Sequence, residues 1–400
     1  MGIVVQKYGG SSVADVDKIK RVADRIAATR AQGQQVVVVV SAMGHTTDEL
    51  LGLARRVSES PARRELDMLL SVGERITMAL LSMALNARDI PAVSFTGSQS
   101  GIITTDSHNN ARIVEVRPFR VQDELARERV VIVAGYQGVS YKREVTTLGR
   151  GGSDTTAVAL AAALDAEACE IYSDVDGVYS ADPRVVPEAR RLGELSYEEM
   201  QELAEAGAKV LHAQAVEFAK ERGIALYCRA TAGSEGETVV RRSPPTRAGG
   251  AVGVASEKGL VQLSTRSGEL DALREVLAHL EEHQVTGKEI QYRSPGEGSS
   301  GQASLLLSRE NLHDLTSIVA RLEGRAGGVT LREGVGAVSA IGSGINASFA
   351  NLRKALDAAA AVEAAVLGIS TSSFRISVLV EERHLPELTR GFHQALVEDR

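Results

Sequence analysis

The stretch from Val145 to Ala163, VTTLGRGGSDTTAVALAAA, constrains most strongly what this chain folds into. A β-branched run is followed by glycines, and Ser153 or Asp154 then opens an apolar stretch at helical spacing without proline. This order predicts a strand, a glycine turn and a capped helix. Such a turn presents backbone amides and a helix start to an anion, and Arg150 adds a fixed cation, so we expect a phosphate there.

Asp154 is out of place in a site that only binds an anion. A carboxylate beside a phosphate is useful where it orients basic groups or a metal ion, so the stretch favours phosphoryl transfer over passive phosphate binding. For a glycine-rich turn alone, an ordinary tight connection between strand and helix is the alternative interpretation.

The N-terminal part of the chain repeats this order of elements twice. Ile3–Tyr8 is predicted to be a strand that ends at glycines, followed by a helix over Val13–Arg30, and the apolar strand Gln35–Val40 leads through Ser41–Thr47 into another helix. Strands that alternate with helices predict a doubly wound parallel sheet, which binds its ligands at the carboxyl ends of the strands.

We therefore expect three segments to converge on one edge of the sheet: Lys7, Ser41–Thr47 and Gly149–Asp154. Lys7 stands beside paired glycines, where its ammonium would reach a phosphate held on the loop amides. Glu74 lies in an apolar helix predicted over Met68–Ala84, which favours a carboxylate that reaches into a cleft and binds a substrate ammonium.

Two further apolar strands, Val130–Ala134 and Glu170–Ser173, and a helix over Tyr197–Ala206 complete this half of the chain. The polar loop from Asp174 to Arg184 is long enough to wrap a nucleotide base and ribose. The spacing of its aspartates loosely resembles a calcium loop, but the glycine and glutamate that such a loop needs are missing.

Composition excludes several classes of protein. The 400 residues carry a net charge of −7 without a long basic block, so nothing indicates nucleic-acid binding. The longest apolar run, Val36–Val40, is too short to span a membrane, and the chain opens on a strand pattern, so we expect a cytoplasmic protein. Cys169 and Cys228 are expected as buried hydrophobic residues, and the histidine spacing predicts no structural metal.

The composition changes after residue 231. A segment rich in Gly, Ser, Pro and Arg over 232–250 is predicted to be a linker, which leaves 1–231 as one domain. Two weakly similar halves follow, 251–333 and 334–400. The first has the order βαββαβ, from a strand over Leu260–Thr265 to a strand over Val329–Leu331, and the second begins with a strand over Ala337–Ile341. The second is one strand short, and a strand over Ala251–Ala255 would fill the gap.

The first 230 residues resemble the aspartate kinases in the order and spacing of seven motifs. These motifs are Lys7–Ser12, Val39–Gly44, Ser71–Glu74, Gly135–Gly138, Gly149–Asp154, Ser173–Arg184 and Lys209–Val210. The resemblance implies the α/β amino acid kinase fold, a mainly parallel eight-stranded sheet between helices, followed by α+β tandem ACT modules. It also implies the transfer of the ATP γ-phosphate to the side chain of L-aspartate, which gives 4-phospho-L-aspartate, the first step toward lysine, threonine, methionine and diaminopimelate.

Carried over position by position, the resemblance implies roles for individual residues. Lys7 and Asp154 would form the phosphoryl-transfer centre. The amino acid would be held by Ser41, Thr47, Glu74, Arg150, Gly151, Gly152 and Ser153, with Arg150 on its α-carboxylate. The nucleotide would be held by Lys7, Gly9, Gly10, Ser11, Ser173, Asp174, Tyr179, Asp182, Pro183, Arg184, Lys209 and Val210. Mg²⁺ would be held mainly through the phosphates, without a metal site built from the protein.

The C-terminal modules depart from the family pattern. The turn Ser264–Glu269 lacks the Asp-x-Pro-Gly sequence common in the family, and Glu289–Tyr292 lacks its usual Asp- or Asn-bearing ending. The loop after Gly344 is short, and Ser370–Ser373 carries serine where lysine-regulated relatives often have glutamate. A pocket with few carboxylates binds an ammonium weakly, so we expect weakened feedback by lysine and threonine, with the modules kept for homo-oligomer assembly.

Three other kinds of protein are alternatives to an aspartate kinase. A nicotinamide-dependent oxidoreductase would need GxGxxG after the first strand, where this chain has Gly9-Gly10. A regulatory protein with an inactive kinase domain would lack Lys7 or Asp154, and both are present. An acetylglutamate kinase or glutamate 5-kinase is the nearer alternative, but neither typically has tandem ACT modules or the Ser71–Glu74 motif.

Overall fold

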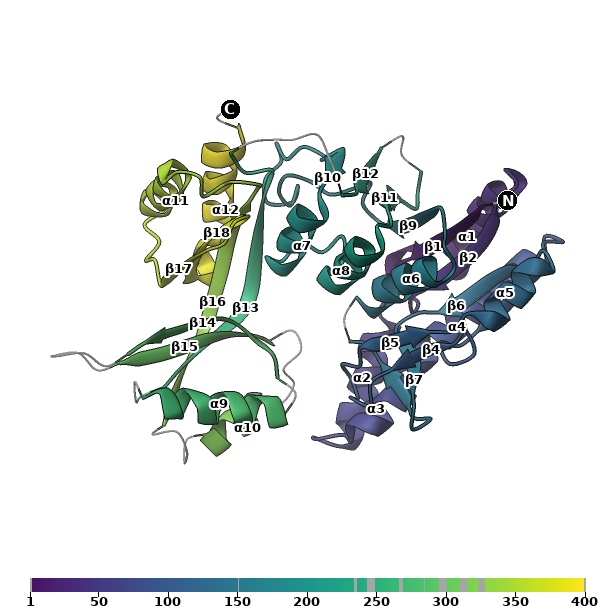
Figure 1. Ribbon diagram of the computed structural model, residues 1–400, viewed down its shortest axis with the longest axis horizontal. Helices are drawn as coiled ribbons and strands as arrows, with labels where there is room; N and C mark the ends of the chain where they lie inside the picture. Colours follow the sequence, from purple (N-terminus) through teal and green to yellow (C-terminus); the bar gives the residue numbers. More distant parts are fainter. Residues whose placement is uncertain are drawn as a thin grey trace. The chain divides into compact units, whose positions relative to one another are not determined.

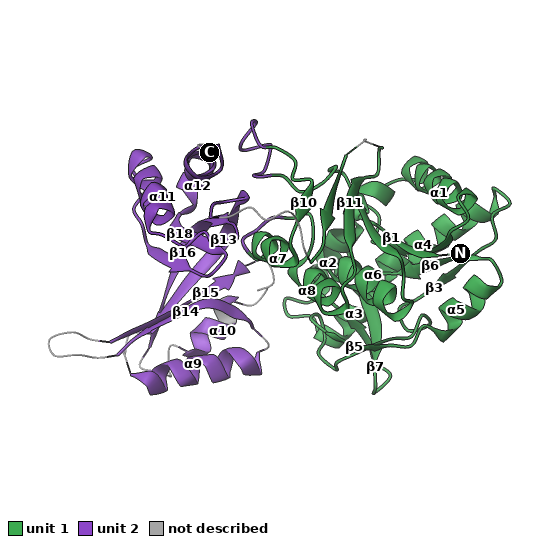
Figure 2. Ribbon diagram, turned by 45° about the horizontal axis from the view of Figure 1, so that its top comes forward, with its two compact units in different colours: residues 1–179, 190–205, 209–246 green, residues 180–189, 206–208, 247–400 purple. Residues whose placement is uncertain are grey.

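The computed structural model describes residues 2–149, 151–233, 236–242, 249–265, 269–283, 285–294, 301–309, 315–322 and 328–398. The chain divides into two compact units (Figure 2). The first unit contains residues 1–179, 190–205 and 209–246, and the second contains 180–189, 206–208 and 247–400. Each unit has its own sheet (Figure 1).

An eight-stranded sheet forms the centre of the first unit, in the order β10-β12-β11-β9-β1-β2-β6-β3. Among the described strands of this sheet, the pair of β11 and β12 is antiparallel and the other neighbouring pairs are parallel, so the mainly parallel eight-stranded sheet that the resemblance implies is confirmed. Its strands are β1 (Ile3–Tyr8), β2 (Gln35–Val40), β3 (Ala92–Phe95), β6 (Val130–Ala134), β9 (Ala168–Ser173), β10 (Glu194–Leu195), β11 (Leu226–Ala230) and β12 (Glu237–Val240).

Helices cover both faces of this sheet. The helices are α1 (Val16–Ala31), α2 (Thr46–Val57), α3 (Arg63–Leu70), α4 (Val72–Asn86), α5 (Phe119–Ala126), α6 (Gly152–Ala163), α7 (Tyr197–Glu205) and α8 (Ala213–Arg222). Tyr8 packs with apolar residues of α1 and α4 on one face. Because successive side chains of a strand point to opposite faces, Lys7 faces the other side, where it meets α6.

A smaller sheet that the sequence did not predict lies in the same unit. It has the order β5-β4-β7-β8 and is built from β4 (Ile102–Thr104), β5 (Ile113–Val116), β7 (Gln137–Ser140) and β8 (Val145–Thr147). β8 is the strand predicted before the glycine turn, although it pairs in this sheet and not in the large one. The other three strands are three or four residues long, which leaves too little alternation for a sequence pattern to reveal them.

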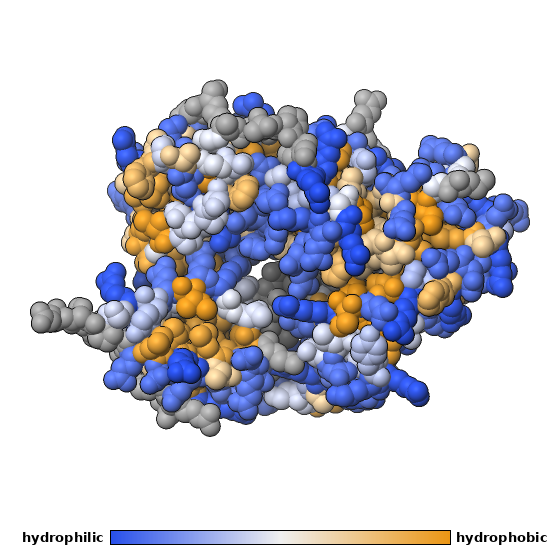
Figure 3. Space-filling view, viewed as in Figure 1, coloured by the Kyte–Doolittle hydropathy of each residue, from blue (hydrophilic) through white to orange (hydrophobic). Residues whose placement is uncertain are grey.

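The helix predicted over Met68–Ala84 is two helices, α3 and α4, that meet at Ser71. Together they are long and apolar enough to cross a membrane by composition alone, but half of their most apolar window is buried inside the unit. The exposed apolar residues Met68, Val72 and Ile76 follow helical spacing along one side. Apolar residues also reach the surface in groups among polar ones on the face drawn in Figure 3.

The second unit is built on a six-stranded antiparallel sheet in the order β14-β15-β13-β16-β18-β17. Its strands are β13 (Gly253–Thr265), β14 (Gly287–Arg293), β15 (Gln302–Ser308), β16 (Val329–Ile341), β17 (Gly368–Thr371) and β18 (Arg375–Glu381). Its helices are α9 (Leu270–Glu282), α10 (Leu315–Leu322), α11 (Ala350–Ala361) and α12 (Leu385–His393). Two separate apolar cores lie under α9 with α10 and under α11 with α12.

Four short strands predicted in this unit are joined in pairs, so that the structure has two long strands in their place. Residues 251–255 and 260–265 were expected as separate strands, as were 329–331 and 337–341, but β13 and β16 each run through without interruption. The polar residues between them form irregular pairing and bulges, with Gly259 at φ 73° and Gly334 at φ 68°. A bulge absorbs extra residues without ending a strand, which is why the sequence suggested loops.

The predicted linker 232–250 also differs from the structure. Its residues Glu237–Val240 form β12, in which Thr238 and Val240 are fully buried and pair with β11 in the first sheet. The sequence did not reveal this strand, because four residues between polar segments show too little alternation of apolar and polar residues. The turn Arg266–Gly268 lies outside the described residues.

Candidate active site

Lys7 of β1 and Asp154 of α6 meet at the carboxyl end of the sheet. Lys7 Nζ lies 2.7 Å from Asp154 Oδ1, and the two side chains are only 12% and 10% exposed. The two groups are close enough for an ion pair, although they are not aligned as a hydrogen bond. Asp154 lies in the first turn of α6, where the helix dipole favours a negative charge.

The loop after β1 lies against this pair. A Cβ atom added to Gly9 would be 3.5 Å from Lys7 Nζ, so the ammonium lies over this glycine. The Gly9 N–H donates to Tyr172 O at 3.1 Å, which removes it from the amides expected to bind a phosphate. Gly10 and the exposed Ser11 begin a short 3₁₀ helix, whose first N–H groups have no intrahelical acceptor.

Backbone hydrogen bonds align the ends of neighbouring strands along this edge. Ser41 N donates to Tyr8 O at 3.1 Å, and Gly44 N donates to Gly10 O at 3.1 Å. The three segments expected to converge therefore do so through these bonds and through the contact between Lys7 and Asp154.

Glu74 reaches this edge from the first turn of α4. Its side chain is 3% exposed, and Oε1 accepts a hydrogen bond from Ala42 N at 3.1 Å. Oε2 has no hydrogen-bond partner among the described residues. Burial raises the pKa of Glu74 to about 7. The close approach depends on Gly73, because a Cβ there would lie 2.7 Å from Ala42 Cβ.

Thr47, another predicted substrate residue, lies half-buried in the first turn of α2. The helix begins at Thr46, whose hydroxyl donates to Met43 O at 2.7 Å and not to an amide of the helix. The same segment thus supplies Ser41, the amide that binds Glu74, and Thr47.

The glycine turn before α6 differs in detail from the prediction. The helix begins at Gly152, after Gly151 in the left-handed region at φ 68°, so neither Ser153 nor Asp154 is its cap. Both lie inside the first turn and are buried. A Cβ at Gly151 would lie 2.3 Å from the His212 side chain, which leaves room for glycine only. Arg150 lies outside the described residues.

The residues predicted to bind the nucleotide begin at the end of β9. Ser173 Oγ bonds with the backbone of Val175, and Asp174 is exposed. The Tyr179 hydroxyl donates to Asp176 Oδ1 at 2.7 Å, and Arg191 Nη1 lies 2.9 Å from Asp176 Oδ2. Asp176 and Arg191, which were not predicted as site residues, therefore hold Tyr179 in place.

The remaining nucleotide residues belong to different units. Asp182, Pro183 and Arg184 lie in the second unit, where Arg184 binds both oxygens of Asp182. Lys209 and Val210 lie in the first unit, with Lys209 exposed and Val210 half-buried.

Asp67 is a buried charged residue that the sequence interpretation missed. Its carboxylate binds groups on the segments before Ala111 and before Gly149. The sequence does show an acidic residue between the apolar residues Leu66 and Met68. It was overlooked because the predicted helix began at Met68, one residue after Asp67.

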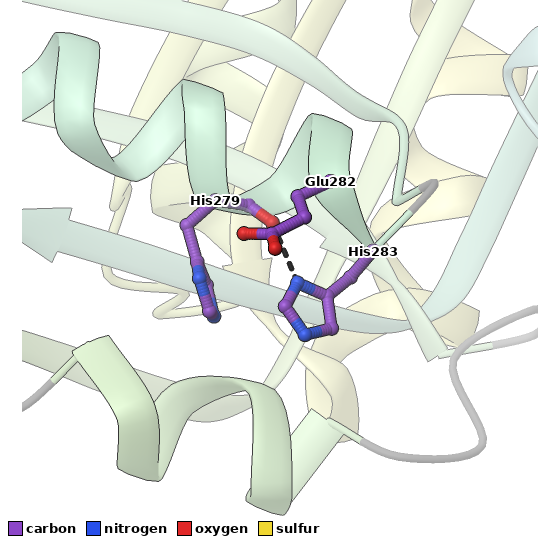
Figure 4. A group of neighbouring side chains, drawn as sticks. All are labelled: His279, Glu282 and His283. Atoms are coloured by element: carbon purple, nitrogen blue, oxygen red, sulfur yellow. Dashed lines mark hydrogen bonds between the residues drawn. The ribbon is translucent and has the colours of Figure 1, made fainter.

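Two histidines and a glutamate of the second unit lie near one another, with ligand atoms within 4.8 Å (Figure 4). His279 and His283 are four residues apart, a spacing typical of metal ligands that the sequence interpretation overlooked. His279 Nε2 donates to Ile318 O at 3.0 Å, and His283 Nδ1 donates to His279 O at 2.8 Å. The Arg321 guanidinium lies 3.3 Å from His283 Nε2. A cation in this position opposes a metal ion, so we assign no metal to His279, Glu282 and His283.

The chain is similar to known proteins over nearly its whole length. The model of the amino acid kinase family matches residues 2–230. An aspartokinase of Corynebacterium glutamicum is 44% identical over 405 residues, which cover 98% of this chain and 96% of that protein.

Solved structures match over the whole chain. The crystal structure of E. coli aspartokinase III in complex with aspartate and ADP, in its R-state, superposes with a TM-score of 0.84 at 25% identity, covering 98% of this chain and 99% of that one. The complex of the same enzyme with lysine and aspartate, in its T-state, gives a TM-score of 0.73 at 25% identity, with 99% of each chain covered.

Proposed function

Because this chain belongs to the amino acid kinase family and is an ATP-dependent aspartate kinase of amino-acid biosynthesis, we propose that Lys7 and Asp154 form its phosphoryl-transfer centre. The observation that carries this proposal is the 2.7 Å contact between Lys7 Nζ and Asp154 Oδ1 beside the Gly9–Ser11 loop. The contact fixes a cation where the transferred phosphate and the acceptor carboxylate would meet.

The chemistry needs positioning and charge neutralisation more than proton transfer. The side-chain carboxylate of aspartate is ionised at neutral pH and attacks without a general base. The protein must bring two anions together, and the Lys7 ammonium, the amides of Gly10 and Ser11, and the start of α6 all offer positive potential for this purpose. Asp154 holds Lys7 in place through their ion pair.

The amino acid would be held at its two ends. Glu74 Oε2, buried and without a described partner, suits the substrate ammonium, and Arg150 suits the α-carboxylate through two parallel hydrogen bonds. The other residues proposed to line this part of the site are Ser41, Thr47, Gly151, Gly152 and Ser153.

ATP would bind along the continuing edge of the sheet. The residues proposed for its phosphates, ribose and base are Lys7, Gly9, Gly10, Ser11, Ser173, Asp174, Tyr179, Asp182, Pro183, Arg184, Lys209 and Val210. Mg²⁺ supplies charge neutralisation on the phosphates. Because Asp154 is already paired with Lys7, these residues fit an ion held mainly by the nucleotide.

We further propose a cytoplasmic homo-oligomer that assembles through the second unit. Its edge strands β14 and β17 expose Ile290, Tyr292 and Ile369, which a second copy would cover. Lysine and threonine are proposed as weak effectors.

The test combines a substrate panel with charge variants. Purified enzyme with Mg-ATP is given L-aspartate, L-glutamate or N-acetylglutamate, and hydroxylamine traps the acyl phosphate. We expect hydroxamate from aspartate, and a loss of kcat of about 10³-fold or more in Lys7→Met and Asp154→Asn, with the fold kept. Lys20→Met, an exposed lysine of α1, is the matched control. Normal turnover of Lys7→Met would contradict the assignment.

A further inference from the structure

Asp67 of α3 binds two segments of the chain at once through a fully buried carboxylate. The side chain is 0% exposed. Its Oδ1 accepts from the Thr147 hydroxyl and from Asn109 N at 3.0 Å, and its Oδ2 lies 2.7 Å from His108 Nδ1. Both carboxylate oxygens are thus occupied by donors that come from elsewhere in the chain.

On one side Asp67 is tied to the helix that carries Glu74. Ser71 N donates to the backbone oxygen of Asp67 at 3.0 Å, and α4 begins at the next residue. Gln137 Nε2 donates to Ser71 O at 2.8 Å, which fixes the junction between α3 and α4. The position of Asp67 therefore sets where the first turn of α4 lies.

On the other side Asp67 is tied to the start of the glycine turn. Thr147 is the last residue of β8, and the turn follows at Gly149, which has φ 76°. Ala111 N donates to Thr147 O at 2.9 Å, so the segment that supplies His108 and Asn109 also holds this strand end. The Thr147 hydroxyl is the group through which the carboxylate reaches the turn.

We propose that Asp67 is a positioning residue of the aspartate site, which fixes the spacing between the first turn of α4, where Glu74 lies, and the glycine turn that leads into α6. This inference rests on the proposed roles of Glu74 and of Gly151, Gly152 and Ser153 in holding the amino acid. Aspartate is short, so a shift of either segment by a fraction of an ångström weakens the contacts on both sides. The same spacing disfavours glutamate, whose side chain is one methylene longer. When the ammonium and the α-carboxylate are held in place, the side-chain carboxylate of aspartate reaches Lys7 and that of glutamate would lie too far along.

A purely structural role explains the carboxylate less well. Burial raises the pKa of Asp67, and the hydrogen bonds from Thr147, His108 and Asn109 act in the opposite direction. Burying a charge is costly even when it is paired, and an apolar residue often fills such a site with equal or greater stability. What an apolar residue would not supply is a fixed connection between α3, the segment at His108 and the end of β8.

The experiment uses neighbouring threonines of β8. Thr147→Val removes the hydroxyl that donates to Asp67, whereas Thr147→Ser keeps a hydroxyl at this position. Thr146→Val is the matched control, because Thr146 is equally buried but pairs with Thr104 at 2.6 Å and not with Asp67. The KM values for aspartate and ATP and the kcat are measured for the full-length enzyme, together with the melting temperature.

We expect Thr147→Val to raise the KM for aspartate about tenfold or more, with the KM for ATP changed less than about twofold. Thr147→Ser and Thr146→Val should keep the aspartate KM within about twofold of wild type. Asp67→Asn, which replaces an acceptor oxygen with a donor facing other donors, should raise the aspartate KM and lower the preference for aspartate over glutamate.

The proposal is overturned if Thr147→Val behaves like Thr146→Val, or if the KM values for aspartate and ATP rise together. Failure of the proposed function would be seen elsewhere, in the wild-type substrate panel or in normal turnover of the Lys7 variant. The two failures are therefore distinguishable.

Discussion

Glu74 accepts a hydrogen bond from the backbone amide of Ala42 through one oxygen, at 3.1 Å, while its other oxygen is buried without a partner among the described residues. Burial raises the pKa of this carboxyl to about 7. The ionised form is the one that binds an ammonium, and its population increases as pH rises through this value.

We therefore expect the KM for aspartate to fall as pH rises from about 6 to about 8. Glu74→Gln keeps the shape and the bond to Ala42 N, so it should raise the aspartate KM and flatten this pH dependence. Initial rates at varied aspartate and saturating ATP, measured across the pH range, check the prediction. A profile of the same steepness in Glu74→Gln would assign the pH dependence to another group.

The same residue should lower the stability of the unliganded protein. The carboxyl ionises near 4.5 when unfolded and near 7 when folded, so folding takes up a proton between these values and stability falls as pH rises through them. The shift corresponds to roughly 3 kcal/mol. Glu74→Gln should unfold at higher denaturant than wild type at about pH 8 and lose this advantage at about pH 4. Equal midpoints at the higher pH would contradict the raised pKa.

Alanine at the two glycines after β1 should have different effects. Gly9 has φ −69°, which alanine adopts readily, but the new methyl group would lie 3.5 Å from Lys7 Nζ, beside the phosphate region. Gly9→Ala should fold normally and lose activity by about tenfold or more, mainly because the KM for ATP rises. Gly10→Ala would place a Cβ 2.9 Å from Ala42 O and should lower the melting temperature. Circular dichroism melts and ATP titrations separate the two effects.

Feedback inhibition should be weak. Besides the serines at Ser370–Ser373, the one carboxylate of Glu289–Tyr292, that of Glu289, is engaged by Arg375, whose Nη2 lies 3.5 Å away. Two missing charge-assisted hydrogen bonds weaken effector binding by roughly a hundredfold or more. Titration with lysine, threonine and both together at moderate aspartate should give little inhibition below about a millimolar concentration. Half-maximal inhibition below that level would show that the modules still bind an effector.

The parallel sheet could be predicted because its central strands are rich in apolar residues and alternate with helical patterns. Gln35–Val40 and Val130–Ala134 have the bounds that the sequence indicated. The convergence of Lys7 and Asp154 on one edge also followed from the rule that parallel sheets bind ligands at the carboxyl ends of their strands, although their ion pair was not predicted. These features depend on local pattern and topology, which a single sequence contains.

Other features depend on contacts between distant segments. Asp67 stands between apolar residues in the sequence, but its role depends on partners that lie more than 40 residues away. Residue type predicted Ser153 or Asp154 as the cap of α6, but the cap is Gly151. Glycine is needed there because a Cβ atom would clash with the His212 side chain. Strand ends in the second unit were placed at polar residues, although the pairing of β13 with β16 continues past them.

The uninterrupted course of β13 and β16 has a mechanical consequence. Each passes beneath both helix pairs, and the two are hydrogen-bonded to each other along nearly their whole length. A hinge needs a few residues that change φ and ψ freely, and along these paired strands such freedom is concentrated in the irregular stretch around Gly259 and Gly334. Any tilt between the two halves of this sheet must therefore bend both strands at that stretch, and a chimera that exchanges one half for that of another protein has to cut both strands at matching residues.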